Sequence, residues 1–170
     1  MMAALTADSQ APVSRPPQLS PFIVESLAPL LASLISSERD AAIAQGVEPI
    51  PSGIRAALEG YVPDEVLDRV RWREGGTQLS LPQNVIRFGD AYAMTLDDVI
   101  AFADRNAALE DPKLWAHELK HVMQFAEWGV GGFAVRYLSD HEAVEAEAVE
   151  FRWEFMKQAG LLPVVPPPAE

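Results

Sequence analysis

Cysteine is absent from this sequence, and its absence excludes several kinds of site at once. A chain without cysteine forms no disulfide, no zinc–thiolate or iron–sulfur centre, and has no cysteine nucleophile. Positive charge is scarce: 13 Lys and Arg residues stand against 25 Asp and Glu residues, a formal net charge of −12. Because such a field repels a phosphate backbone, we expect no nucleic-acid partner. Any metal site must be built from His, Asp and Glu side chains.

Long hydrophobic runs are also missing, which bears on membrane insertion and export. The apolar stretch Phe22–Ile35 contains Glu25 and Pro29 and is shorter than the about 20 residues that a membrane-spanning helix needs. The N-terminal stretch has no basic residue before Arg15 and no uninterrupted apolar run, so it does not fit a secretory signal. We therefore expect a cytoplasmic protein without a membrane span, for which export would need a dedicated system.

Length and proline placement predict one folded unit between two tails. A chain of 170 residues suits a single domain, which can bury about two-thirds of the surface of its unfolded chain. Four of the 14 prolines fall between positions 12 and 21 and four between 163 and 168, and proline opposes both helix and sheet. We expect extended or disordered tails over 1–21 and 163–170, and a single domain over 22–162.

The hydrophobic pattern predicts helices, then a small sheet, then helices, which is an α+β arrangement. Early helices are expected over Phe22–Ala44, Ser52–Glu59 and Asp64–Arg69. Short strands are expected over Val70–Glu74, Thr77–Leu81, Val85–Phe88, Ala91–Leu96 and Val99–Phe102. Core positions are expected at Leu27, Leu30, Leu31, Leu34, Ile35, Trp115, Trp128 and Trp153. The first helix is thus interpreted as part of the core, although a role as a lid over a cleft stays open.

A predicted helix that begins at the N-cap residue Asp111 and ends at Gly129 carries the main chemical motif. Its residues 117–121 spell HELKH, the HExxH pattern. Residues four apart share one face of a helix, so His117 and His121 can reach a single zinc ion at about 2.0–2.1 Å. The intervening Glu118 can reach a water held by the metal and act as a general base.

Metal binding is favoured over the simpler interpretation of two core histidines bonded to backbone carbonyls. The helix is apolar on most of its surface, which predicts that it is buried, and an unpaired buried polar group costs about 1–3 kcal/mol. Gln124 and Glu127 occupy the positions where the metzincin pattern has Gly and then His or Asp, which excludes that class of protease.

A tetrahedral catalytic zinc site needs a third protein ligand. After the glycines at 129, 131 and 132, Ser139 followed by Glu142 resembles a capping box, which predicts a further helix from Ser139 to about Ala159.

Glu145 is the predicted third ligand, because it lies on the drier flank of the apolar stripe of that helix. Glu147 shares its flank with Glu150 and Glu154 and is expected to lie on a solvated edge. His141 and Glu142 remain the alternatives for the third ligand.

The segment LWAHELKHVMQFAEWGVGGFAVRYLSDHEAVEAEA resembles a bacterial family of small HExxH proteins of unknown function. Its members are often encoded near extracellular contractile injection systems and toxin genes. The upstream segments VRWREGG and AYAMTLDDVIAF are similar to the strand-rich region that precedes the zinc helix in that family. The resemblance covers about residues 64–150.

More broadly, the pattern is similar to gluzincin metallopeptidases. This resemblance implies a zincin-like fold (a minimal gluzincin), in which a small mixed sheet packs on the HExxH helix and a glutamate-bearing helix follows. It also implies zinc (Zn2+) held by His117, His121 and Glu145, with Glu118 as the base. The family often has Asp where this chain has Val149, so we do not expect that position to support a zinc-bound histidine.

The leading hypothesis is a zinc-dependent metallopeptidase that acts on a peptide or protein substrate. Tyr137 and His141 are candidate donors to the transition-state oxyanion, although a packed core role is favoured for Tyr137. The predicted strand Val99–Phe102 could hold an extended substrate at a sheet edge. Two alternatives are a catalytically weak, zinc-stabilised interaction or structural module, and an effector delivered by a secretion or injection system, whose components would then be partners.

Overall fold

A four-stranded mixed sheet lies within the described part of the chain, which comprises residues 18–75, 79–80, 87–88 and 92–162 of a computed structural model. Its strands are β1 (Glu48–Pro49), β2 (Arg71–Glu74), β5 (Ala93–Leu96) and β6 (Val99–Phe102). They lie in the order β1-β2-β6-β5, where β2 and β6 are parallel and the other pairs antiparallel. A separate antiparallel pair joins β3 (Leu79–Ser80) and β4 (Arg87–Phe88).

The position of β6 corrects one expectation. Val99–Phe102 was predicted as an edge strand able to hold a substrate, but it is paired with β2 on one side and β5 on the other. Its backbone groups are therefore used within the sheet. Two further elements were not predicted at all: the short strand β1 and the helix α4 (Arg105–Glu110).

Both strands of the β5–β6 hairpin are buried at every position, and they contribute to two cores. Because successive side chains point to opposite faces of a sheet, the two faces of the hairpin separate the clusters. One core contains Ala93, Ile100 and Phe102 together with Trp72 and Trp115. The other contains Met94 and Leu96 together with residues of the first helix.

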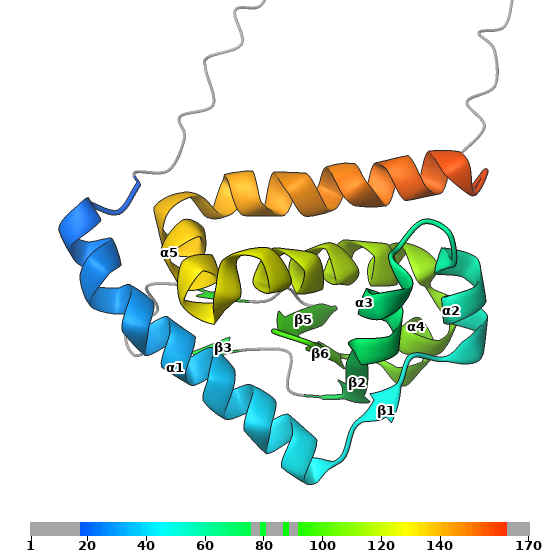
Figure 1. Cartoon of the computed structure of the whole chain (residues 1–170), viewed down its shortest axis with the longest axis horizontal. Coiled ribbons are helices and arrows are strands. Elements are labelled where there is room, and N and C mark those ends of the chain that lie inside the picture. Colours follow the sequence, from blue (N-terminus) through cyan, green and yellow to red (C-terminus); the bar gives the residue numbers. More distant parts are fainter. Residues whose placement is uncertain (1–17, 76–78, 81–86, 89–91, 163–170) are drawn as a thin grey trace, which may run out of the picture.

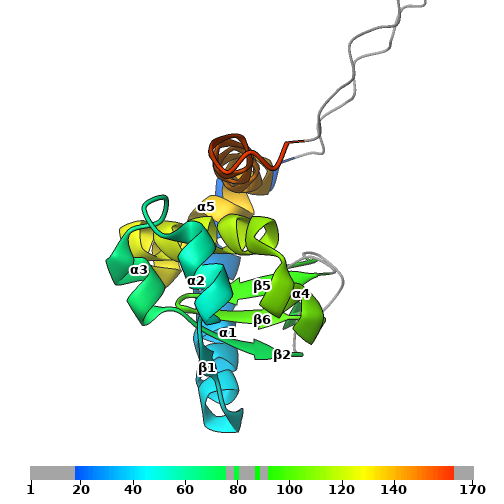
Figure 2. The same cartoon turned by 90° about the vertical axis from the view of Figure 1, so that its right-hand side faces the viewer.

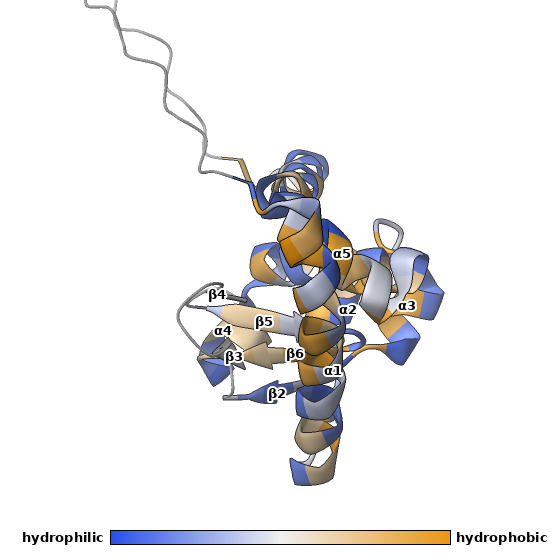
Figure 3. Cartoon of the chain, turned by 90° about the vertical axis from the view of Figure 1, so that its left-hand side faces the viewer, coloured by the Kyte–Doolittle hydropathy of each residue, from blue (hydrophilic) through white to orange (hydrophobic). Residues whose placement is uncertain are grey.

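Helix α1 (Pro21–Gln45) forms a long arm beside the sheet and the C-terminal helices (Figure 1). Ser20 caps its start, Gly46 ends it with a φ of 107°, and it continues through Pro29. Hydrophobic residues recur along α1 with polar bands between them (Figure 3). Its buried residues are Val24, Ala28, Leu31, Ile35 and Ala42.

This periodicity explains which of the expected core leucines in α1 are buried. Leu31 and Ile35 are completely buried, and Leu27 and Leu34 are partly buried against the same cluster. Leu30 is 50% exposed, contrary to prediction, because one residue along a helix turns its side chain by about 100° from the buried face.

Two contacts fix α1 to the rest of the fold. Its apolar side packs against the C-terminal helices in a shared core. In addition, Arg39 makes two hydrogen bonds, of 2.6 Å and 3.1 Å, to the carboxylate of Asp98 in the β5–β6 turn. A bidentate contact of this kind fixes the relative orientation of the two side chains as well as the distance between them.

The short helices α2 (Ser52–Leu58) and α3 (Asp64–Arg69) lie against the longest helix, α5 (Pro112–Gln158) (Figure 2). Ile54, Leu58 and Leu67 belong to the cluster that includes Trp115. Among the described residues, no helix combines the length and apolar character that crossing a membrane requires.

The longest element, α5 (Pro112–Gln158), is broken at two residues with non-helical dihedral angles, Gly129 and Asp140. We call its parts the first (112–128), middle (130–139) and last (141–158) segments. The last segment returns alongside the first (Figures 1 and 2). The break at Gly129, with a φ of 70°, agrees with the predicted helix end.

The second break differs from the predicted capping box. Ser139 donates its hydroxyl hydrogen to the carbonyl of Val135 at 2.7 Å, so its side chain belongs to the middle segment. Asp140 caps the last segment instead, because its Oδ1 accepts a hydrogen bond from the Ala143 N–H at 3.1 Å. Of the expected tails, residues 1–17 and 163–170 lie outside the described residues, as do parts of the strands predicted over Thr77–Leu81 and Val85–Phe88.

Candidate metal centre

The fold brings together two histidines of the first segment of α5 and one glutamate of the last. His117, His121 and Glu145 each offer one ligand atom, and these atoms all lie within 4.8 Å of one another. The Nε2 atoms of the two imidazoles are 3.3 Å apart. The Glu145 carboxylate oxygens lie 3.3 Å from Nε2 of His117 and 3.6 Å from Nε2 of His121.

These separations suit a small tetrahedral cation. For metal–ligand bonds of 2.0–2.1 Å and tetrahedral angles, ligand atoms lie about 3.3–3.4 Å apart. The three separations match this value to within a few tenths of an ångström. Two nitrogens and one carboxylate oxygen are also donors that zinc prefers. The residues present therefore fit the ion that the HExxH pattern implies.

The site is buried on the histidine side and open on the glutamate side. The side chains of His117 and His121 are 9% and 8% exposed, whereas that of Glu145 is 40% exposed. Glu145 is therefore the most exposed of the three side chains.

Charge and burial act on the ligand atoms in opposite directions. Burial raises the pKa of Glu145, but hydrogen bonding with His117 and His121 outweighs it and holds that pKa well below its usual range. Burial lowers the pKa of His121, but the hydrogen bond with Glu145 and the charge of Glu118 outweigh it, so this pKa is raised. The surroundings of these side chains thus favour positive charge at the point where the three of them meet.

Glu118 lies beside this group with its carboxylate held by the sheet. It is 3% exposed, and its Oε2 accepts a hydrogen bond from the hydroxyl of Thr95 in β5 at 2.7 Å. A strand thereby sets the direction of the carboxylate that the HExxH pattern assigns as the base.

A second network supports His121. Gln124 is completely buried, and its Oε1 lies 2.8 Å from Nδ1 of His121. Its amide nitrogen donates to the backbone carbonyl of Val144 at 3.1 Å and to the carboxylate of Glu147 at 3.0 Å. Glu147 also pairs with Lys120 at 3.3 Å. The hydrogen bond from Gln124, together with Lys120, lowers the pKa of Glu147 although partial burial opposes this.

Glu147 is thus not the purely solvated residue that its flank predicted. Its side chain is 47% exposed, yet its carboxylate joins the last segment of α5 to the first.

His117 has no equivalent support. Its Nδ1 is buried and has no hydrogen-bond partner among the described residues. Val149, a position that we did not expect to support a zinc-bound histidine, is partly buried and has no polar atom in its side chain.

The other candidate site residues lie elsewhere. Tyr137 is 7% exposed and packs in the α1–α5 core, with its ring stacked on Phe133 at 5.7 Å between centroids, as the packing interpretation predicted. His141 is exposed, and neither it nor Glu142 belongs to the group of ligand atoms among the described residues.

The three tryptophans differ in burial. Trp115 is completely buried, as predicted, whereas Trp153 is 46% exposed, contrary to prediction. Trp128 is partly buried, and the guanidinium of Arg136 lies 4.5 Å from its ring centroid. Trp153 is exposed because the last segment packs on the fold with one face only, the face that carries Val144, Ala148 and Phe155.

Sequence reasoning missed the roles of Thr95 and Gln124, and it placed Glu147 on a solvated edge. Gln124 follows His121 by three residues, so helical geometry places it on the same face. No comparable spacing points to Thr95, because its contact with Glu118 joins residues 23 positions apart.

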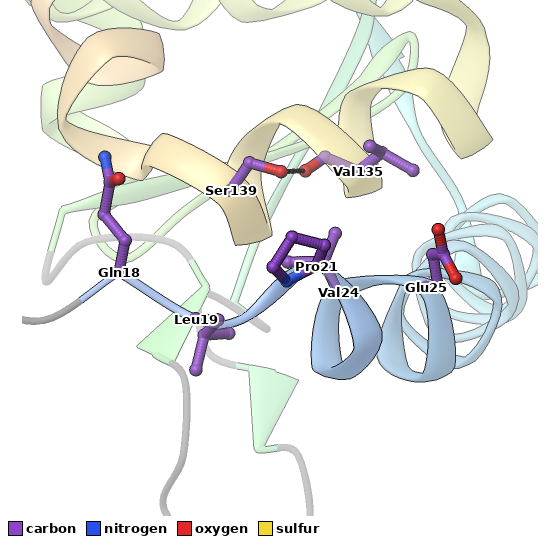
Figure 4. A pocket seen from close by; sticks show the side chains of 7 residues that line it. All are labelled: Gln18, Leu19, Pro21, Val24, Glu25, Val135 and Ser139. Atoms are coloured by element: carbon purple, nitrogen blue, oxygen red, sulfur yellow. Dashed lines mark hydrogen bonds between the residues drawn. The ribbon is translucent and has the colours of Figure 1, made fainter.

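A separate hollow lies between the start of α1 and the middle segment of α5 (Figure 4). It is lined by Gln18, Leu19, Pro21, Val24, Glu25, Val135 and Ser139. None of these residues belongs to the candidate metal centre.

Residues 49–129 match the family model described as the eCIS core domain, which links the chain to the extracellular contractile injection systems. The match starts 15 residues before the expected range of 64–150 and stops 21 residues before the end of that range. It includes His117, Glu118 and His121 but stops before the segment that carries Glu145. No curated protein and no solved structure matched the chain.

Proposed function

We propose that this chain is a zinc-dependent metallopeptidase in which His117, His121 and Glu145 hold the metal. The observation that carries the proposal is the spacing of three ligand atoms at 3.3–3.6 Å, drawn from two segments separated by two breaks of α5. Two core histidines satisfied by backbone carbonyls would not need to face each other and a carboxylate.

The roles of the surrounding residues follow from their contacts. Zinc bound here would polarise a substrate carbonyl and make a water molecule more acidic. Glu118 would accept a proton from the attacking water at its carboxylate and pass it to the leaving amine as the peptide C–N bond breaks. Thr95 keeps this carboxylate directed by its 2.7 Å hydrogen bond. A peptide reaches the site from the open side, past Glu145.

A single substitution separates metal binding from catalysis. Glu118→Gln preserves the size of the side chain and all three metal ligands but removes the base. We expect this variant to keep stoichiometric zinc and to lose peptide cleavage by about 100-fold or more, measured on a diverse peptide library. Glu127→Gln, the same change at an exposed position of the same segment, is the matched control and should retain activity. Equal activity of all three proteins would contradict the proposal.

A second candidate function is a metal-stabilised module or delivered effector of an injection system. The match of residues 49–129 to the eCIS core domain supports it. So does the packing of Tyr137, one of the two candidate oxyanion donors, inside the core. This alternative gains if zinc binds stoichiometrically while the wild-type chain and Glu118→Gln are equally inactive.

A further inference from the structure

Gln124 joins the metal-binding face of the first segment of α5 to the backbone of the last segment. It is completely buried. Its side chain contacts Nδ1 of His121, the carbonyl oxygen of Val144 and the carboxylate of Glu147 at 2.8–3.1 Å. A terminal amide has one acceptor oxygen and one donor nitrogen, so these partners limit how it can be oriented.

The carbonyl of Val144 decides the orientation of the amide. A backbone carbonyl can only accept hydrogen bonds, so the Gln124 NH2 group must face Val144. The same group then donates its other hydrogen toward Glu147. The remaining atom, Oε1, faces His121 and can only accept. The proton between Oε1 and the imidazole must therefore reside on Nδ1 of His121.

We propose that Gln124 is a positioning residue that holds the neutral His121 ring in its Nδ1–H tautomer. When the ring is protonated, Nε2 donates toward Glu145; when the ring is neutral, Nε2 carries the lone pair that a cation would bind, and it faces His117 Nε2 and the Glu145 carboxylate, 3.3 Å and 3.6 Å away. The consequence for metal affinity rests on the proposed function, whereas the tautomer itself is a property of the metal-free fold.

The two histidines are consequently unequal. His121 is oriented by a relay that ends at Val144 and Glu147, whereas Nδ1 of His117 has no partner among the described residues. An oriented ligand loses less freedom on binding, and second-shell partners of metal-bound histidines are typically worth 10–100-fold in affinity. His121 is therefore the preorganised ligand of the pair.

Two substitutions at position 124 separate orientation of the ring from packing. Gln124→Leu keeps the approximate volume but removes the acceptor for Nδ1–H. Gln124→Glu keeps an acceptor oxygen, although it loses the donor to Val144, as the leucine variant also does. A structural role of the amide would make both variants fail alike, whereas an orienting role would affect only the leucine variant. Gln158→Leu, at an exposed position of the last segment, is the matched control.

The first measurement is nitrogen-15 NMR of the imidazole rings in the metal-free, full-length chain, at a pH where His121 is neutral. The chain has only three histidines, so single substitutions assign them. We expect the Nδ1–H tautomer for His121 in the wild type, in Gln124→Glu and in Gln158→Leu, and its loss in Gln124→Leu. An Nε2–H tautomer in the wild type overturns the inference, and so does an unchanged tautomer in a folded Gln124→Leu. If the leucine variant does not fold, the wild type and Gln124→Glu still test the inference, because both must show the Nδ1–H tautomer of His121.

The second measurement is zinc affinity by competition with a chromogenic chelator. We expect Gln124→Leu to bind zinc about 10–100-fold more weakly, with a smaller loss in Gln124→Glu and none in Gln158→Leu. Equal affinities in a folded Gln124→Leu and the wild type would contradict the preorganising role. A wild-type chain that binds no zinc would overturn the proposed function. The NMR measurement of the His121 tautomer in the metal-free chain would still test the orienting role of Gln124.

Discussion

The hydroxyl of Thr95 donates a hydrogen bond to the carboxylate of Glu118 at 2.7 Å, in a contact that is buried on both sides. It connects strand β5 to the first segment of α5, so the small sheet does more than fill space beneath the helix. The direction of the Glu118 carboxylate is thus determined by the sheet.

Removing this hydroxyl should weaken the base without affecting the metal ligands. Thr95→Val preserves the shape of the side chain but leaves a buried carboxylate oxygen without this donor, at a cost of about 1–3 kcal/mol. We expect lower stability by that amount, reduced peptide cleavage and unchanged zinc content, measured by chemical denaturation, a peptide assay and metal analysis. Thr95→Ser keeps the hydroxyl and should retain activity. Zinc loss in a folded Thr95→Val would show that Thr95 supports the ligands instead.

Removing the carboxylate of Glu145 should abolish tight metal binding. Glu145→Gln keeps the size of the side chain but replaces the carboxylate with a neutral amide, so that of the three proposed ligands only the two histidines remain. We expect zinc to raise the melting temperature of the wild type. At a zinc concentration 100 times the dissociation constant, binding adds about 2.7 kcal/mol to the free energy of unfolding. The melting temperature of Glu145→Gln should not change with zinc. The same change at exposed Glu150 is the control. A full zinc response in Glu145→Gln would remove Glu145 from the ligand set.

The metal-free chain should be most stable in mildly acidic solution. The pKa of Glu145 is lowered in the folded state, so its contribution is present above the unfolded value of about 4.3 and is lost as the pH falls. The pKa of His121 is raised, so its contribution is fully present below about 6.5 and is lost as the pH rises. Both contributions coincide between about pH 4.5 and 6.5.

Urea denaturation with a chelator present, repeated from pH 4 to 9, measures this profile. We expect the maximum to flatten in Glu145→Gln, because that change removes the partner of His121 along with the carboxylate. Glu150→Gln should keep the wild-type profile. A wild-type stability that rises steadily from pH 5 to 9 would contradict the expected interaction of Glu145 with His121.

Local sequence patterns predicted the elements well where the signals lie close together in the chain. The break at Gly129, the helix α3 and the face shared by His117 and His121 follow from residues within one or two turns of each other. The choice of Glu145 over His141 and Glu142 came from helical geometry alone, and the structure brings Glu145 to the histidines.

Predictions failed where the answer depends on packing between distant segments. The place of β6 inside the sheet is determined by its pairing with β2, which lies nearly thirty residues earlier, and no feature of Val99–Phe102 itself shows it. Trp153 and Leu30 are apolar, yet they are exposed because each lies on the uncovered side of a helix that packs on one face. Thr95 became visible only through its contact with Glu118.

Helix α1 packs as part of the core rather than as a lid, and two neighbouring leucines provide the test. Leu31 is completely buried and Leu30 is 50% exposed. Truncation of a buried leucine to alanine costs about 2–5 kcal/mol, whereas an exposed change stays within about 0.5 kcal/mol. We therefore expect Leu31→Ala to lower the free energy of unfolding of the whole chain by about 2–5 kcal/mol in urea denaturation. Leu30→Ala should leave it nearly unchanged.

Because α1 shares a core with Phe125 and Phe133, its unfolding should coincide with that of α5. A Leu31→Ala chain with wild-type global stability but faster proteolysis confined to α1 would show that the helix opens independently, as a lid does.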